Sequence, residues 1–493
     1  MTSHGWITTT MIMLPLIGAL VLWVVPMPRV WVAPTALLVS LFEVGFWIEA
    51  LVRYDFDRGG LQEWNHATWL KDLGVSYSVG FYQGFSVWLV GLTSIVMAAS
   101  IAYGAWMGRD RPRAYYGLML FLTGAIVGVF TAQDLLLFYV FWEAMLIPLY
   151  VLIGAWGGPG RLNATIKFVI YTMVGSLLML AAVIVYGLQA GTFSMISGGT
   201  NASDWIFLGF AAAFVVKAPL FPFHAWLPET YRESSPEVAA VLSGVVSKAA
   251  AYGFLRIAIA KFPGPVSDFR TPILVLAAVG LIYGSLLAFR APDIRGVIAY
   301  SSLAQLGLIM LGLFATNSLG INGAVLQMVN HGLISAVLFM LAGAVERRAA
   351  TGRFESLGGM AKGRPALATV LMATGIIALA VPGSGAFAGE FAILAGVFQQ
   401  GWLYAVVGAV AIVLAAMYVL RMISAILHAR KGPAVHDAAL DLRPAELAIL
   451  VPLVAILLFL SAWPASITER VTPGRNISNP VGYTTATAES QPK

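Results

Sequence analysis

Five ionisable residues stand inside long apolar stretches of this sequence, where a charge is difficult to accommodate. A charged side chain at the centre of a bilayer costs at least about 2.5 kcal/mol, so each such residue needs a function or a partner. Burial disfavours the charged form of a side chain and a nearby opposite charge restores it, as a proton carrier requires. The five residues are Glu143, Lys217, Lys248, His331 and Glu390.

A static role is the alternative for these residues. A buried ion pair, for example between Glu143 and Lys217, could hold two helices in register. Burying several charges for that purpose alone is costly, because desolvation opposes the attraction within each pair. The set as a whole therefore favours the movement of an ion, most simply of protons.

Other polar residues of the apolar stretches are weaker candidates for a role in proton transfer. His224 could relay a proton from Lys217 toward the cytoplasm, or it could be an interfacial imidazole. Asp134 is either the N-terminal charge of a helix or a gate where protons enter. Positions at the membrane surface are expected for the remaining charged residues near the ends of apolar stretches, namely Arg256, Arg421, Glu43 and Glu49.

Composition excludes several classes of protein. Of the 493 residues, 59% are hydrophobic and 11% are charged, whereas soluble chains carry about a quarter charged residues. With no cysteine, the chain cannot hold thiolate-ligated iron–sulfur clusters. No nucleotide-binding motif and no metal site is expected. The net charge of +6 comes from basic residues in short loops, which are orientation signals and not a surface for nucleic acid.

The apolar stretches predict an all-α polytopic membrane protein, because no β-barrel alternation is present. Each crossing of roughly 30 Å of hydrocarbon needs about 20 residues, which predicts about fourteen transmembrane helices. Residues 53–82 are expected outside, as a small ordered cap or a plain loop. The predicted spans are 6–26, 30–52, 83–107, 113–131, 132–155, 164–190, 203–227, 237–262, 269–289, 292–316, 319–346, 366–398, 403–428 and 444–467.

Two of these spans are interrupted in a comparable way, at 217–222 and at 381–385. Proline removes a backbone donor and clashes with the preceding turn, so each span should unwind locally. Interrupted helices in corresponding positions of two halves point to inverted repeats with an ion path between them. The alternative is that proline is simply frequent in membrane helices. An ionisable residue beside each interruption favours the ion path.

The distribution of Lys and Arg predicts that both termini lie on the outer, periplasmic side of a cell inner (plasma) membrane. With this orientation, more basic residues fall in cytoplasmic loops than in external ones, as the positive-inside rule requires. The segment 6–25 is expected to be a retained first span, because no basic residue precedes it. The cytoplasmic loops would contain Arg109, Arg111, Arg113, Arg347, Arg348 and Arg353.

From about residue 115 to 430, the chain resembles the antiporter-like membrane subunits of respiratory NADH:quinone oxidoreductase (complex I) and their cation/proton antiporter relatives. The pattern is most similar to the M-type chains of complex I. Six segments carry the resemblance: DLLLFYVFWE (134–143), KAPLFPFHAWLP (217–228), KAAAYGFLR (248–256), IAYSS (298–302), NHG (330–332) and AGEF (388–391).

The resemblance implies a fold of two inverted five-helix repeats. The N-terminal three-helix segment would cover 1–112, the first repeat 113–262, the second 269–428, and a C-terminal helix with a polar tail 429–493. It also implies roles for the buried charges. Glu143 and Lys217 would form a proton-modulating pair, Lys248 would carry the relay on, and Glu390 would stand where sister chains have lysine.

The function implied is that of a proton-translocating subunit driven by quinone reduction in other chains. NADH, FMN, iron–sulfur clusters and quinone would be bound by partner subunits, and the neighbours in the bilayer would be L- and N-type chains. One alternative is a subunit of a multi-subunit cation/proton antiporter. Others are the membrane arm of a hydrogenase or formate-oxidising complex, and a purely structural scaffold.

Two positions depart from the family pattern. The family often has histidine where this chain has Gln305, and Leu-Pro-Asp-Ala-His is usual where this chain has LPETY at 227–231. Because Gln305 cannot titrate, the central relay is expected to run through water, Lys248 and His331, or around that point.

Overall fold

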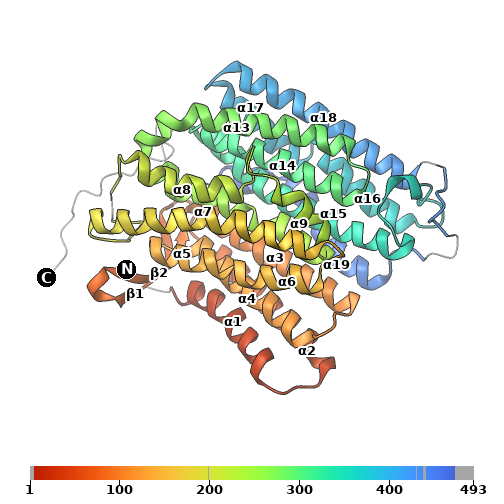
Figure 1. Cartoon of the computed structure of the whole chain (residues 1–493), viewed down its shortest axis with the longest axis horizontal. Coiled ribbons are helices and arrows are strands. Elements are labelled where there is room, and N and C mark those ends of the chain that lie inside the picture. Colours follow the sequence, from red (N-terminus) through yellow and green to blue (C-terminus); the bar gives the residue numbers. More distant parts are fainter. Residues whose placement is uncertain (1–4, 198, 429, 437–439, 472–493) are drawn as a thin grey trace.

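Most of the chain is helical in the computed structural model, which describes residues 5–197, 199–428, 430–436 and 440–471. Twelve helical stretches in these ranges are long and apolar enough to cross a membrane. Figure 1 shows the helices lying side by side in one bundle. The prediction of an all-α polytopic membrane protein is confirmed.

The helices follow the apolar segments of the sequence. Helices α4, α10, α13, α16 and α19 begin with proline, whose missing N–H is harmless there. Before residue 235 lie α1 (Trp6–Val24), α2 (Arg29–Arg53), α3 (Gln83–Met107), α4 (Pro112–Thr131), α5 (Leu135–Ala144), α6 (Leu146–Trp156), α7 (Arg161–Ala190), α8 (Asp204–Lys217) and α9 (Trp226–Glu233). After it lie α10 (Pro236–Val241), α11 (Lys248–Gly253), α12 (Ile259–Lys261), α13 (Pro263–Arg290), α14 (Ile294–Phe314), α15 (Ser318–Ala349), α16 (Pro365–Ala378), α17 (Gly385–Phe398), α18 (Trp402–Leu427), α19 (Pro444–Ala462) and α20 (Ala465–Thr468), with the short 3-10 turn η4 (Phe354–Ser356).

The segment expected outside forms an antiparallel hairpin. Strand β1 (Leu61–Leu70) pairs with β2 (Val75–Tyr82) across the turn η1 (Lys71–Leu73). Figure 1 places the hairpin at one end of the bundle, near the N-terminus. Strand β2 is mostly buried and β1 is mostly exposed. Of the two alternatives for this segment, the ordered structure is therefore confirmed and the plain loop is wrong, while its position on the outer side stays a prediction.

Both predicted interruptions are present. Helix α8 ends at Lys217 and α9 begins at Trp226, while α16 ends at Ala378 and α17 begins at Gly385. Between each pair the backbone forms turns and not helix. Neither interrupted span contains a helix as long as 18 residues, so the count of fourteen spans stays a prediction.

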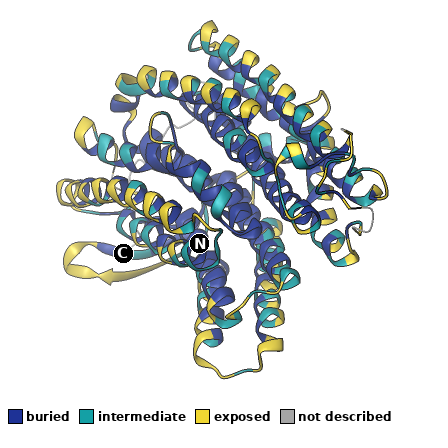
Figure 2. Ribbon diagram, turned by 45° about the vertical axis from the view of Figure 1, so that its right-hand side comes forward, coloured by how far each residue is buried: buried dark blue, intermediate teal, exposed yellow. Residues whose placement is uncertain are grey.

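One continuous helical rod, from Pro236 to Lys261, runs through the centre of the bundle with every residue buried. It contains two π-helical stretches, η2 (Leu242–Val246) and η3 (Phe254–Ala258), on either side of α11. Helix α15 is buried from residue 323 to 345 beside it. Figure 2 shows this buried centre surrounded by helices that expose one side. Widened π-turns are frequent at functional sites.

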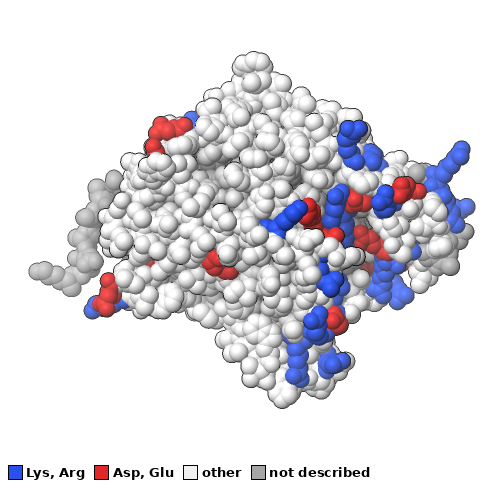
Figure 3. Space-filling model, viewed as in Figure 1, with Lys and Arg blue, Asp and Glu red and all other residues white. Residues whose placement is uncertain are grey.

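Charged residues collect at one end of the bundle, opposite the hairpin (Figure 3). We call this the arginine-rich end; it contains the connections 108–111 and 350–364. Ion pairs tie its helix ends together, since Arg109 binds Glu237 and Arg295 binds Glu346. On the face that Figure 3 shows, few charged residues interrupt the surface between the two ends, as expected for a surface in contact with lipid.

Two charges expected at the membrane surface are instead buried inside the protein. Arg256 is fully buried. Its guanidinium donates to Gln133 Oε1 at 2.7 Å and lies 3.7 Å from the centroid of the Tyr82 ring, and these contacts accommodate the charge. Glu43 is also fully buried, and neither carboxyl oxygen has a hydrogen-bond partner among the described residues. It lies well inside α2, on the side of that helix that faces the bundle. Glu49, in contrast, is partly exposed and pairs with Arg53.

The inverted repeats and the four-part division stay predictions. The polar tail expected after the last helix lies, from residue 472 onward, outside the described residues.

Candidate functional site

Lys217 lies at the C-terminal end of α8, where the proline-rich interruption begins. Its side chain is buried, and Nζ lies 3.9 Å from the centroid of the Trp142 ring, a cation–π distance. Nζ has no hydrogen-bond partner in the described part of the chain. Glu143, on the adjacent α5, interacts electrostatically with Lys217, and its Oε1 is also without a hydrogen-bond partner within the described ranges. The structure therefore brings the predicted pair together without a direct hydrogen bond to Lys217.

Lys248 begins α11, between the two π-helical stretches, and its side chain reaches His331 on α15. The Nζ and Nδ1 atoms are 2.8 Å apart. Nζ also donates to the Ser243 carbonyl oxygen and, at 3.4 Å, to Ser247 Oγ. An ammonium group can only donate, so a charged Lys248 requires Nδ1 to accept and places the imidazole hydrogen on Nε2. That Nε2 is buried and finds no partner among the residues described.

A small cavity connects His331 with Glu390. It has a volume of about 30 Å³, and a water needs roughly 10–15 Å³. Both Gln305 and Gln327 also line it. Water in this cavity would join the free imidazole nitrogen to the carboxyl group of α17.

Gln305 holds Glu390 in place. Its Nε2 donates to Glu390 Oε1 at 2.9 Å, and its Oε1 accepts from Gln327 Nε2 at 2.8 Å. Gln327 Nε2 also lies 3.3 Å from Glu390 Oε1. The second carboxyl oxygen has no partner in the part of the chain described. Gln305, which cannot titrate, thus orients Glu390, which can.

The second departure from the family pattern, LPETY at 227–231, also lies near Lys248, beside the serines that surround it. Tyr231 is fully buried, and its hydroxyl lies beside those of Ser243 and Ser247 without a hydrogen bond of ordinary geometry. Ser243 is in turn 2.8 Å from Ser302 on α14. Sequence reasoning missed these hydroxyl groups, since serine is common in membrane helices and only packing shows which serines meet.

His224 and Asp134 lie apart from the side chains around Lys248 and Glu390. His224 is half-buried in the interruption after α8, between the rings of Phe221 and Tyr283 at 5.6 and 5.2 Å. Asp134 is the N-cap of α5, because one oxygen accepts from the backbone N–H groups of Leu136 and Leu137. Its other oxygen accepts from the backbone N–H and hydroxyl of Ser76 in β2. Asp134 thereby ties the hairpin to the bundle.

Glu237 is a buried charge that sequence reasoning missed. Its oxygens accept from Arg109 at 2.7 and 2.8 Å and from the Tyr115 hydroxyl at 2.5 Å. These contacts fasten the start of α10 to the connection between α3 and α4. The signal was Ser-Pro-Glu at 235–237, which is typical of a helix N-terminus.

Comparisons with known proteins give one consistent family. A family model described as "NADH:quinone oxidoreductase/Mrp antiporter, TM" matches residues 132–415. The chain is 35% identical over 483 residues to "NAD(P)H-quinone oxidoreductase chain 4 1" of Synechococcus sp. (strain JA-2-3B'a(2-13)), covering 94% of this chain and 90% of the relative. It is 34% identical over 465 residues to "NADH-quinone oxidoreductase subunit M" of Rhodobacter capsulatus, with 90% and 89% covered. A chain of respiratory complex I from Thermus thermophilus with bound NADH has a TM-score of 0.86 at 29% identity, with 94% of this chain and 97% of that chain covered.

Proposed function

The chain belongs to the NADH:quinone oxidoreductase/Mrp antiporter family of membrane proteins, and from this membership we propose that it is an M-type, proton-translocating subunit of an NADH:quinone oxidoreductase. Quinone reduction in other subunits would drive the proton movement. NADH, FMN, iron–sulfur clusters and quinone would be bound by those partners, and L- and N-type chains would lie beside this one in the bilayer.

The observation that carries the proposal is the hydrogen bond from Lys248 to His331, because His331 also lines the cavity that Glu390 lines. A proton held on Lys248 has an acceptor 2.8 Å away. From the second imidazole nitrogen, water in the cavity would carry the proton to Glu390. This route passes Gln305 without requiring that residue to titrate.

The first half of the route would begin at Lys217. When the charge of Glu143 is close and present, Lys217 keeps its proton; when that charge is neutralised or displaced, burial favours release. Tyr231, Ser243 and Ser247 would then carry the proton toward Lys248. Their hydroxyl groups can both donate and accept, as a relay requires.

We assign the arginine-rich end to the cytoplasm and the hairpin end, with both termini, to the outside of a cell inner membrane. The collection of basic residues at one end supports this orientation by the positive-inside rule.

Proton pumping by the assembled complex tests the proposal. In proteoliposomes, Lys217→Ala or Glu143→Ala is expected to lower proton translocation and coupled turnover while the complex stays assembled. Unchanged pumping in both variants would contradict the roles assigned to this pair.

A cation/proton antiporter subunit is the second candidate, because the matched family includes Mrp antiporters. The native assembly separates the two. Purification with NADH-oxidising chains supports the first function, and purification with small antiporter subunits alone supports the second. Co-purified hydrogenase or formate-oxidising chains would indicate instead that the chain belongs to the membrane arm of a hydrogenase or formate-oxidising complex.

A further inference from the structure

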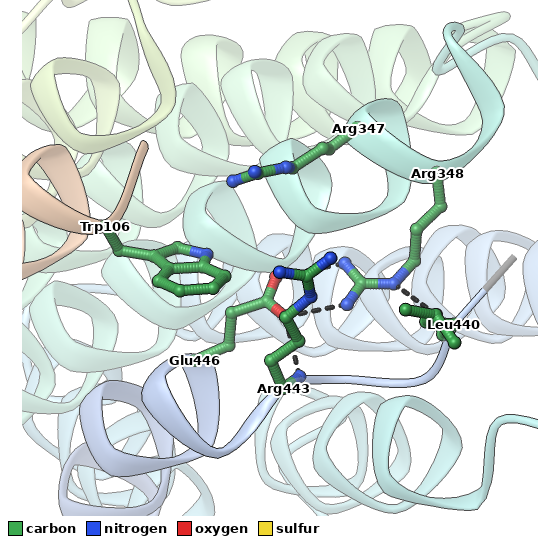
Figure 4. Close-up of a pocket in the computed structure, with 6 residues that line it drawn as sticks. All are labelled: Trp106, Arg347, Arg348, Leu440, Arg443 and Glu446. Carbon is green, nitrogen blue, oxygen red and sulfur yellow. Dashed lines mark hydrogen bonds and ion pairs between the residues drawn. The ribbon is translucent and has the colours of Figure 1, made fainter. Parts of the chain in front are cut away.

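A pocket of about 210 Å³ lies at the arginine-rich end, where α3 and α15 end and α19 begins. Figure 4 shows the side chains that line it, which come from all three helices and from the segment that leads into α19. They are Trp106, Arg347, Arg348, Leu440, Arg443 and Glu446. Three arginines and one glutamate leave an excess of two positive charges.

Arg348 forms part of the wall of the pocket, where its charge is already neutralised. Arg348 donates to both carboxyl oxygens of Glu446, at 3.0 and 2.6 Å, and to the carbonyl oxygens of Ala344, Leu440 and Asp441. The side chains of this pair are only 8% and 2% exposed. Because Arg348 and Glu446 neutralise each other, neither needs a ligand.

The other two arginines remain unneutralised. Both Arg347 and Arg443 are exposed, and their guanidinium carbons lie 5.3 and 5.5 Å from the Trp106 ring centroid. Neither forms an ion pair with an acidic residue of the described chain; Arg347 donates only to Met107 Sδ. The Trp106 Nε1–H is buried and also lacks a partner among the described residues. The pocket thus offers two cations and one hydrogen-bond donor to an anion.

The position of the pocket indicates what kind of anion it meets. The ends of membrane-crossing helices lie at the depth of lipid head groups, and tryptophan is enriched there. From Pro444 onward, α19 exposes an apolar stripe that leads from the pocket along the bundle. Its large members are Val451, Leu458 and Phe459, each about half exposed. A ligand with a charged head and apolar chains would match both features.

We propose that this pocket binds the phosphate group of an anionic phospholipid. Arg347, Arg443 and the Trp106 N–H contact the phosphate, and the acyl chains lie along the exposed side of α19. A basic pocket between helix ends is a site where anionic head groups bind. An acidic segment of a neighbouring protein would satisfy the arginines, but it would not use the apolar stripe.

The test uses the purified native complex in nanodiscs that contain phosphatidylglycerol with a photoreactive acyl chain. Labelled peptides are mapped by mass spectrometry. We expect label on α19 between residues 444 and 459, with competition by unlabelled phosphatidylglycerol and none by phosphatidylcholine or inorganic phosphate. Competition by phosphatidylcholine to the same extent would overturn the proposal, as would competition by inorganic phosphate.

The double variant Arg347→Gln/Arg443→Gln removes both unneutralised charges and keeps the pair of Arg348 with Glu446. Its apparent affinity for phosphatidylglycerol should fall about 30-fold, as is typical for the loss of two basic residues. The matched control is Arg29→Gln/Arg290→Gln, which removes two exposed charges outside the pocket. Trp106→Phe keeps an aromatic side chain, though a smaller one, loses the N–H and should weaken labelling to a smaller extent.

Equal labelling of the pocket variant and the control would overturn the proposal. If α19 of the wild-type complex instead cross-links to a neighbouring protein and takes no lipid label, the occupant is a protein segment and the lipid assignment is wrong. None of these readouts depends on proton pumping, so they are independent of the function proposed above.

Discussion

Gln305 Nε2 donates a hydrogen bond to Glu390 Oε1 at 2.9 Å, in a cavity that His331 also lines. In the proposed route, Gln305 therefore does not interrupt the series of titratable groups, because it lies beside them and orients the carboxyl group of Glu390. The geometry separates two properties of Glu390 that substitutions can test independently, its hydrogen bonds and its ability to take up a proton.

Glu390→Gln should leave the complex assembled and abolish most of its proton translocation. The amide fits the same space but cannot take up a proton. Gln305→Leu should instead weaken the local structure by about 1–3 kcal/mol, since it removes the shorter of the two hydrogen bonds to Glu390 Oε1 and leaves Gln327 Nε2 without the Gln305 acceptor. Pumping by proteoliposomes and thermal unfolding of the complex measure the two effects. Normal pumping by Glu390→Gln would remove Glu390 from the route.

Glu237→Ala should destabilise the chain by about 3–5 kcal/mol, because it leaves Arg109 without its buried partner. The control is Glu355→Ala, which breaks an exposed pair with Arg353 and should cost less than about 1 kcal/mol. The shift in the thermal unfolding temperature of the assembled complex compares them. Equal shifts for the two variants would show that the Arg109 pair contributes no more than a surface pair.

Asp134→Ala should loosen the hairpin, because it removes both the N-cap of α5 and the contacts with Ser76. Loss of a helix N-cap costs about 1–2 kcal/mol, and hydrogen exchange in β2 should become faster. Asp134→Asn retains the capping oxygen and should pump normally. If Asp134→Asn lowers proton pumping while hydrogen exchange in β2 stays at the wild-type rate, the carboxyl group is a gate where protons enter, and not only a cap.

The apolar runs and prolines of the sequence were sufficient to predict the helical class and the positions of both interruptions. They could do so because the bilayer imposes the length of a helix and proline removes a backbone donor, and both effects are local. The buried charges were recognisable for the same reason. Lys217, Lys248, Glu390 and His331 stand far from any polar segment, and the structure places all four in the interior.

The rotation of each helix and the contacts between helices could not be predicted from the sequence. Glu43 was expected at the interface, yet the rotation of α2 turns it into the bundle. Arg256 was expected to reach the surface, but the hairpin places Tyr82 over it. The contact of Gln305 with Glu390 and the approach of Tyr231 to the serines depend on how three helices pack, and no single segment encodes it. The π-helical stretches around Lys248 likewise have no signal in the apolar pattern.

The most direct test of the proposed route is the number of protons translocated per NADH oxidised by the complex carrying His331→Gln. Glutamine can hydrogen bond with Lys248 but cannot carry a proton. The matched control, His66→Gln, makes the same change on the exposed face of β1. We predict that proton translocation falls at least about tenfold in the first variant, as expected when a proton-transfer group is lost, and is unchanged in the second. A wild-type proton ratio in His331→Gln would contradict the route from Lys248 to Glu390.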